Sequence, residues 1–211
     1  MLEILAIICL GGFLLIAKRS VVWALALIIL LLPSYLWRLD FLGWPTTFLE
    51  LMIVGLFIFW LIKQQRRQKI NWRLSGFANR IAKPWRYFIL TWLLVSVIAL
   101  IFNFNLSALG LWRAYFLEPI LFLLIFLYSV KNKEDRQIIF YGLGGLVVWL
   151  AFVAIWQSFT AWNLPAAYNE PNIKRLTAVF AYPNALSLLI APITAWFTGL
   201  WLSSKHKSKE L

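Results

Sequence analysis

Apolar residues form long, almost uninterrupted runs along this 211-residue chain, separated by short polar or charged segments. Such runs are typical of helices that cross a bilayer, whereas amphipathic helices interleave polar residues every three or four positions. The runs extend from Leu2 to Ala17, Val21 to Leu36, Thr47 to Ile62, Tyr87 to Phe102, Leu109 to Val130, Ile138 to Trp156 and Ala185 to Leu202. We therefore predict an all-α, polytopic membrane helix bundle of about seven transmembrane helices, as one transmembrane domain over residues 1–211.

The composition supports a membrane protein. Hydrophobic residues make up 63% of the chain and charged residues only 13%, against about 25% charged residues in soluble domains. The net charge of +12 could suggest nucleic acid, but basic residues of membrane proteins gather in cytoplasmic loops, where they meet anionic lipid. We expect contact with membrane lipids and no nucleic acid.

The distribution of basic residues predicts the orientation. Sixteen of the 20 Lys and Arg residues fall on one set of loops and four on the other, which places the larger set in the cytoplasm. The segment 63–86 holds much of that charge, and its apolar residues are three to four apart. It is therefore predicted to be an amphipathic helix on the inner surface, with a solvated loop as the alternative. The run Leu2 to Ala17 would be only about 24 Å long at ~1.5 Å per residue, short for a bilayer core of ~30 Å. If it does not cross, only the N-terminus changes side.

Glu50 is one of the few charged residues near the outer ends of the runs. Thr47 precedes it by three residues, and Thr-x-x-Glu is the pattern of a capping box at a helix start. The functional alternative makes Glu50 a partner of Arg38, or a wall of a polar outer pocket.

Arg113 and Glu118 lie within the fifth run. Ionisable groups at membrane depth usually face the bundle interior and pair. Because residues five apart do not share a helix face well, each is expected to meet a residue of another helix. A structural ion pair and a polar site are both open.

Lys174 and Arg175 lie in an outer loop over residues 157–184. The arginine fork matches phosphate oxygens, so Arg175, Arg113 and Arg38 together could grip a pyrophosphate. Interfacial snorkelling is the alternative. Asn184, after Pro183, is expected to be the N-cap of the last helix. The lone His206 and the absence of a Gly-rich phosphate loop favour no metal, no cofactor and no nucleotide site, and leave any catalytic residue unknown.

Several segments resemble the O-antigen ligase/polymerase family. They are Pro33-Ser-Tyr-Leu-Trp-Arg38, Gly43-Trp-Pro-Thr-Thr-Phe-Leu-Glu50 and Ala108 to Pro119. Arg175-Leu-Thr-Ala-Val-Phe-Ala-Tyr-Pro-Asn184 is similar to the family's Arg-x-Thr/Ser-x-x-Phe-x-x-Pro-Asn stretch.

This resemblance implies a metal-independent glycosyltransferase of the bacterial inner membrane that takes a glycan from an undecaprenyl-pyrophosphate carrier. Arginines hold the pyrophosphate in such enzymes, and a base in a large later periplasmic loop activates the acceptor. It implies that Arg175, and by extension Arg113 and Arg38, contact the carrier.

The chain departs from the family in length, since members usually run to about twice this size and carry the later loop with its histidine. We expect an incomplete relative that is inactive alone, or one completed by a second polypeptide. The alternatives are a non-catalytic membrane module or assembly partner and, less favoured by charges at the helix ends, a small transporter.

Overall fold

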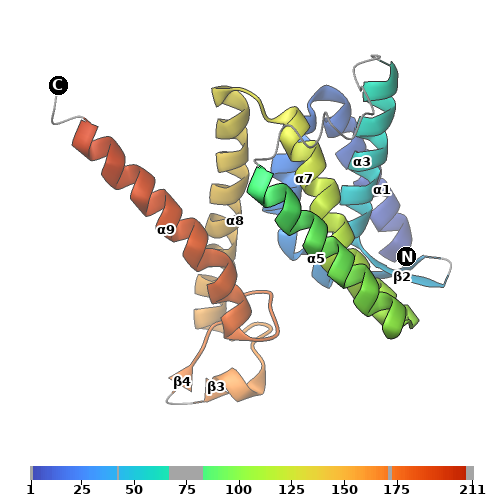
Figure 1. The fold of residues 1–211 in the computed structure, drawn as a ribbon. Coiled ribbons are helices and arrows are strands. Elements are labelled where there is room, and N and C mark those ends of the chain that lie inside the picture. Colours follow the sequence, from blue (N-terminus) through green and yellow to red (C-terminus); the bar gives the residue numbers. More distant parts are fainter. Residues whose placement is uncertain (1, 42, 67–82, 171–172, 208–211) are drawn as a thin grey trace. The chain divides into compact units, whose positions relative to one another are not determined.

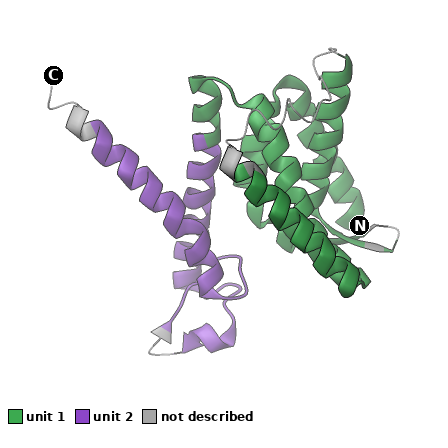
Figure 2. Cartoon of the chain, viewed as in Figure 1, with its two compact units in different colours: residues 1–139 green, residues 140–211 purple. Residues whose placement is uncertain are grey.

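The computed structural model describes residues 2–41, 43–66, 83–170 and 173–207. In these residues the chain is all-α apart from two short hairpins, and it divides into two compact units, residues 1–139 and 140–211 (Figure 2). Residues 67–82, the middle of the predicted basic surface helix, lie outside the described residues. The flanks of that segment are helical and belong to α3 and α5.

Four helical stretches are long and apolar enough to cross a membrane. They are α3 (Phe48–Arg66), the stretch Leu106–Ser129, α8 (Lys133–Thr160) and residues Pro183–Ser204 of α9 (Pro183–Lys207). Val21–Leu30 and Tyr87–Phe102 are shorter apolar helices. These elements indicate a multi-pass membrane protein.

The core of unit 1 lies where α3 packs against α1 (Leu2–Arg19), α2 (Val21–Leu30) and α7 (Glu118–Ser129), as Figure 1 shows. Its fully buried side chains include Leu25 of α2, Met52 and Leu56 of α3 and Ile125 of α7. Each comes from the middle of an apolar run, so this core is the part of the fold that the hydrophobic pattern describes best.

The second apolar run is not one helix, as the sequence suggested. The α-helix α2 ends at Leu30, and a 3₁₀ helix, η1 (Leu32–Leu36), follows it. Pro33 lies in the first turn of η1. Proline has no backbone N–H and its ring clashes with the preceding helical turn, so the α-helix stops before it.

A hairpin that the sequence did not predict precedes α3. Strands β1 (Arg38–Phe41) and β2 (Trp44–Thr47) pair antiparallel, with Arg38 opposite Thr47. Gly43 has φ +81° at the turn, a conformation that glycine adopts without the Cβ penalty of other residues. The hairpin delivers the chain directly into the first turn of α3.

The stretch Leu106–Ser129 is irregular in its middle. The helix α6 (Leu106–Trp112) passes into a π-helical turn, η2 (Arg113–Leu117), and then into α7. The helix α5 (Lys83–Phe102) packs beside it: the Trp112 indole N–H donates to Ser96 Oγ at 3.0 Å, and the Trp92 and Phe116 rings lie 4.5 Å apart. Single π-turns inside α-helices often occur at functional positions, and here the turn carries Arg113.

Unit 2 consists mainly of α8 and α9 joined by a structured loop. The loop contains a short 3₁₀ turn, η3 (Ala166–Tyr168), and a small hairpin of β3 (Asn169–Glu170) and β4 (Ile173–Lys174). The Phe140 ring of α8 contacts the Trp196 and Phe197 rings of α9, with centroids 5.2 and 6.2 Å apart. The predicted runs Ile138 to Trp156 and Ala185 to Leu202 lie inside these helices, which extend beyond them at both ends.

Candidate functional site

A buried amide organises the loop between α8 and α9. Gln157, in the last turn of α8, has no exposed surface. Its Oε1 accepts hydrogen bonds from the backbone N–H groups of Thr177 and Ala178 at 2.8 and 2.9 Å. Its Nε2 donates to Thr177 Oγ1, Ala178 O and Trp162 O at 3.2, 3.2 and 3.1 Å. Buried polar groups are expensive unless paired, and this one is paired at both ends.

The loop segment held by Gln157 is itself buried. Thr177 and Ala178 have no exposed surface, and Phe180 has 4%. Ala178 has φ +51°, a left-handed conformation that costs a residue with a Cβ roughly 1–2 kcal/mol. The two Gln157 bonds to Ala178 hold that strained backbone in place. The Phe180 N–H then donates to Thr177 O at 3.0 Å, which closes the turn that leads to α9.

The two predicted cations lie at opposite helix ends. Lys174 Nζ donates to Ser158 O in the last turn of α8, where unpaired carbonyls and the helix dipole favour a cation. Arg175 Nη2 donates to Asn184 Oδ1 at 3.3 Å, in the first turn of α9. Arg175 also donates its backbone N–H to Tyr168 O at 3.0 Å. Lys174 therefore stabilises α8, whereas the exposed Arg175 side chain lies beside the positive end of α9.

Asn184 is not the N-cap that the sequence suggested. The helix α9 already begins at Pro183, whose fixed φ suits the first helical position. Asn184 is the second residue of the helix, and its side-chain oxygen accepts from Arg175. Arg175 and Asn184, nine positions apart in the chain, thus come together.

Arg113 is engaged within unit 1. Its Nη2 donates to Pro45 O at 2.8 Å and lies 3.3 Å from Glu50 Oε2, while its Nε lies 3.2 Å from Glu50 Oε1. The Nε contact is an ion-pair contact without hydrogen-bond geometry, so the hydrogen bonds of the guanidinium to these partners run through Nη2. Arg113 thereby joins η2 to the β1–β2 hairpin and to α3.

Glu50 forms half of the predicted capping box. Its backbone N–H donates to Thr47 Oγ1 at 3.2 Å. Its carboxylate accepts from Thr46 Oγ1 at 2.8 Å and pairs with Arg113. The expectation that Glu50 partners Arg38 is wrong, because Arg113 occupies that place and the Arg38 side chain is exposed on β1.

Glu118 is buried at the start of α7, with 7% of its surface exposed. The charges of Glu50 and Arg113 both act on it. Arg113 has a carboxylate and a carbonyl as partners, although its Nε makes no hydrogen bond, whereas Arg175 contacts a neutral amide oxygen.

Protein-family models, curated proteins and solved structures give no match to this chain. Within the described ranges, no group of three or more His, Cys, Asp and Glu side chains is placed to hold a metal ion. The α8–α9 loop places the exposed Arg175 side chain beside the first turn of α9.

Sequence reasoning did not single out Gln157 or Thr46. A usable signal existed for Gln157, because an isolated amide at the end of a long apolar run must find partners if it is buried. Nothing in the sequence indicated that those partners would lie 20 and 21 residues further along the chain.

Proposed function

We propose that this protein binds an undecaprenyl-pyrophosphate-linked glycan at the outer face of the bacterial inner membrane. It would take part in glycan transfer during cell-envelope polysaccharide assembly, as the resemblance to O-antigen ligases implies. The observation that carries the proposal is the exposed Arg175 side chain, held beside the first turn of α9 at the end of a buried loop.

This arrangement suits a pyrophosphate for electrostatic reasons. A helix N-terminus carries roughly half a positive charge and unpaired backbone N–H groups, which favour anions. Arginine has five N–H donors, and its contact with Asn184 engages only Nη2. The remaining donors and the helix end can act on the same phosphate.

The position of the loop also suits a lipid carrier. It joins α8 and α9, two of the helices long enough to cross a membrane. A polyprenyl chain could lie in the bilayer against these apolar helices while its headgroup reaches Arg175. In the proposed topology of about seven spans, Lys174 and Arg175 lie outside and the basic segment 63–86 lies inside.

The proposal is confined to binding. The α8–α9 loop contains no histidine, the residue type that the resemblance implies as the acceptor base. The Arg38 side chain is exposed on β1 in unit 1, and the partners of Arg113 and Glu50 favour a structural role for both.

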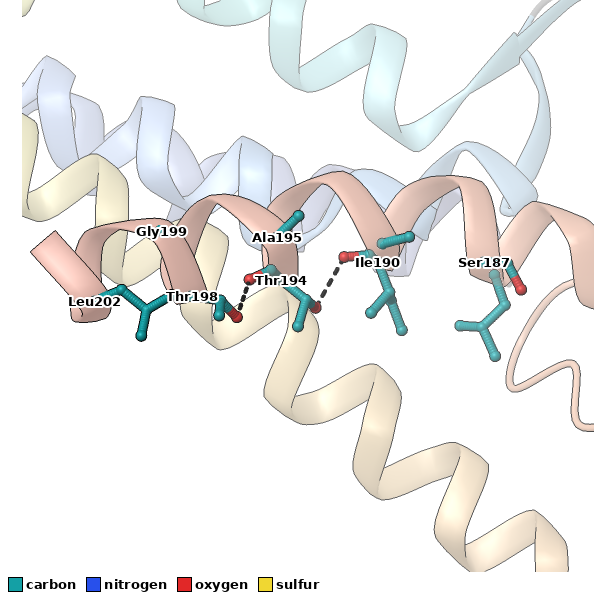
Figure 3. A pocket seen from close by; sticks show the side chains of 9 residues that line it. Ser187, Ile190, Thr194, Ala195, Thr198, Gly199 and Leu202 are labelled. Atoms are coloured by element: carbon teal, nitrogen blue, oxygen red, sulfur yellow. Dashed lines mark hydrogen bonds between the residues drawn. The ribbon is translucent and has the colours of Figure 1, made fainter.

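One observation favours the alternative, a non-catalytic module that assembles with a second polypeptide. An open groove of about 830 Å³ lies along one face of α9, and Figure 3 shows side chains that line it. Small residues at four-residue spacing lie along it, namely Ser187, Ala191, Ala195 and Gly199, and such spacing lets transmembrane helices approach closely. The Thr194 and Thr198 hydroxyls donate within the helix, to Ile190 O and Thr194 O.

Binding of undecaprenyl pyrophosphate to the purified protein in detergent tests the proposal. Arg175→Ala should weaken binding tenfold or more, equivalent to about 1.4 kcal/mol. Arg136→Ala is the matched control, because Arg136 is an exposed arginine in the first turn of α8, on the proposed inner side. Undecaprenol, which lacks phosphate, should bind wild type and Arg175→Ala equally.

Equal losses in the two arginine variants would contradict the proposed site. A wild-type protein that binds neither lipid would contradict the carrier function and favour the assembly module.

A further inference from the structure

We propose that Gln157 is the positioning residue of the carrier site: it sets the backbone path that presents Arg175 to a pyrophosphate. The inference rests on the proposed function and adds to it the residue that builds the site. Gln157 does not touch the ligand in this scheme, because it is fully buried beneath the loop.

The contacts of Gln157 require an amide. Two backbone N–H groups donate to its Oε1, and three oxygens accept from its Nε2. A carboxylate at this position could accept from the N–H groups but would face three oxygens without a proton to offer. A methionine would match its length and satisfy neither set.

These contacts act on Arg175 through the short segment that follows it. The Arg175 N–H is bound to Tyr168 O on one side, and Thr177 and Ala178 are bound to Gln157 on the other. Arg175 is therefore fixed in the backbone from both directions. Its side chain can reach Asn184 only because the chain turns back to α9 through the left-handed Ala178.

Loss of Gln157 removes what holds that turn. A left-handed alanine relaxes when its stabilising bonds are removed, and the path between Arg175 and Pro183 changes with it. The guanidinium then leaves the N-terminus of α9, and the two positive features no longer act on one phosphate.

Two variants test the inference, each with two measurements. Gln157→Met should expose the Thr177 and Ala178 amides to hydrogen exchange and weaken undecaprenyl pyrophosphate binding at least tenfold. Combined with Arg175→Ala, it should cause little further loss, because both act through the same guanidinium. The Arg136→Ala control should change neither measurement.

Gln157→Glu supplies a pH profile that a residue of general structural importance would not show. When protonated, the new carboxyl can accept from the two N–H groups and donate to one of the three oxygens. When ionised, it repels all three. Binding and amide protection should therefore both fall as the pH rises in this variant, and the wild type, measured alongside, accounts for titration of the ligand.

The charged side chains around position 157 have contacts or surroundings of their own and do not account for the pH profile of Gln157→Glu. Lys174 donates to Ser158 O and Arg175 donates to Asn184 Oδ1, and Glu170 of β3 is exposed to solvent. The groups that contact Gln157 itself are carbonyls, amides and a hydroxyl. If Gln157→Met does not fold, Gln157→Glu at low pH provides the folded reference.

The outcomes separate the two proposals. Wild-type binding combined with unchanged binding in Gln157→Met would overturn this inference and leave the carrier function intact. Retained protection of the two amides in Gln157→Met would overturn it as well. Absence of binding in the wild type would overturn the carrier function and, with it, the role of Gln157 in that site.

Discussion

The ion pair between Arg113 and Glu50 can be tested with Arg113→Met, Glu50→Gln and the double variant. Arg113→Met leaves Glu50 without its ion-pair partner and removes a cation whose charge acts on Glu118. Glu50→Gln leaves the guanidinium bound to Pro45 O and still under the influence of Glu118. We therefore expect Arg113→Met to be the more destabilising of the two single changes.

The burial of the pair sets the magnitude. The Arg113 and Glu50 side chains are 23% and 13% exposed. Exposed pairs contribute about 0.2–1 kcal/mol, whereas removal of one partner from a buried pair costs about 3–5 kcal/mol. A partly buried pair lies between these limits, so Arg113→Met should lower the free energy of unfolding by about 2 kcal/mol. At about 2–4 °C per kcal/mol for a chain of this size, the midpoint should fall by roughly 4–8 °C.

Thermal unfolding in detergent, followed by tryptophan fluorescence, provides the measurement. The double variant should lose less than the sum of the single losses, with a coupling energy of about 1–2 kcal/mol. Additivity to within about 0.5 kcal/mol would refute the reasoning. The reasoning would also be refuted if Glu50→Gln raised the affinity for undecaprenyl pyrophosphate and Arg113→Met lowered that affinity, since that result would make Arg113 a ligand contact.

Substitutions at two further positions test how the helices and the loop are held. Ser96→Ala removes the oxygen that accepts from the Trp112 indole and leaves that donor unpaired. It should lower the free energy of unfolding by about 1–3 kcal/mol. An unfolding midpoint within 1 °C of wild type would show that the contact is dispensable. Ala178→Gly suits the left-handed backbone of the loop and should preserve or raise the unfolding midpoint, whereas Ala178→Val should lower it clearly; the opposite order would contradict the backbone conformation described for this turn.

The hydrophobic pattern located the helices because lipid imposes a simple rule. A spanning segment must satisfy its own backbone and present apolar side chains, so the runs mark α3, α8 and α9 to within a few residues. The same pattern overestimated the second run because proline is compatible with an apolar stretch but not with continued α-helix.

The hydrophobic pattern did not predict the two hairpins or the contacts of Gln157, for a different reason. The β1–β2 and β3–β4 pairs are too short to produce a period-two signal. The five contacts of Gln157 join residues up to 21 positions apart. Such contacts depend on the tertiary structure of the loop, which local sequence patterns do not specify.

Arg113 and Arg175 show why residue type alone could not assign the site. Both arginines lie on the predicted outer side, and both were expected to hold a phosphate. The structure gives Arg113 a carboxylate and a carbonyl, which satisfy its charge within unit 1. It gives Arg175 a neutral amide oxygen at the positive end of a helix, so that guanidinium keeps its full charge available. A cation that already has its counter-ion stabilises a fold, and a cation without one is free to bind a ligand. This difference, rather than the arginine itself, is why we propose the carrier site in the α8–α9 loop and not at Arg113.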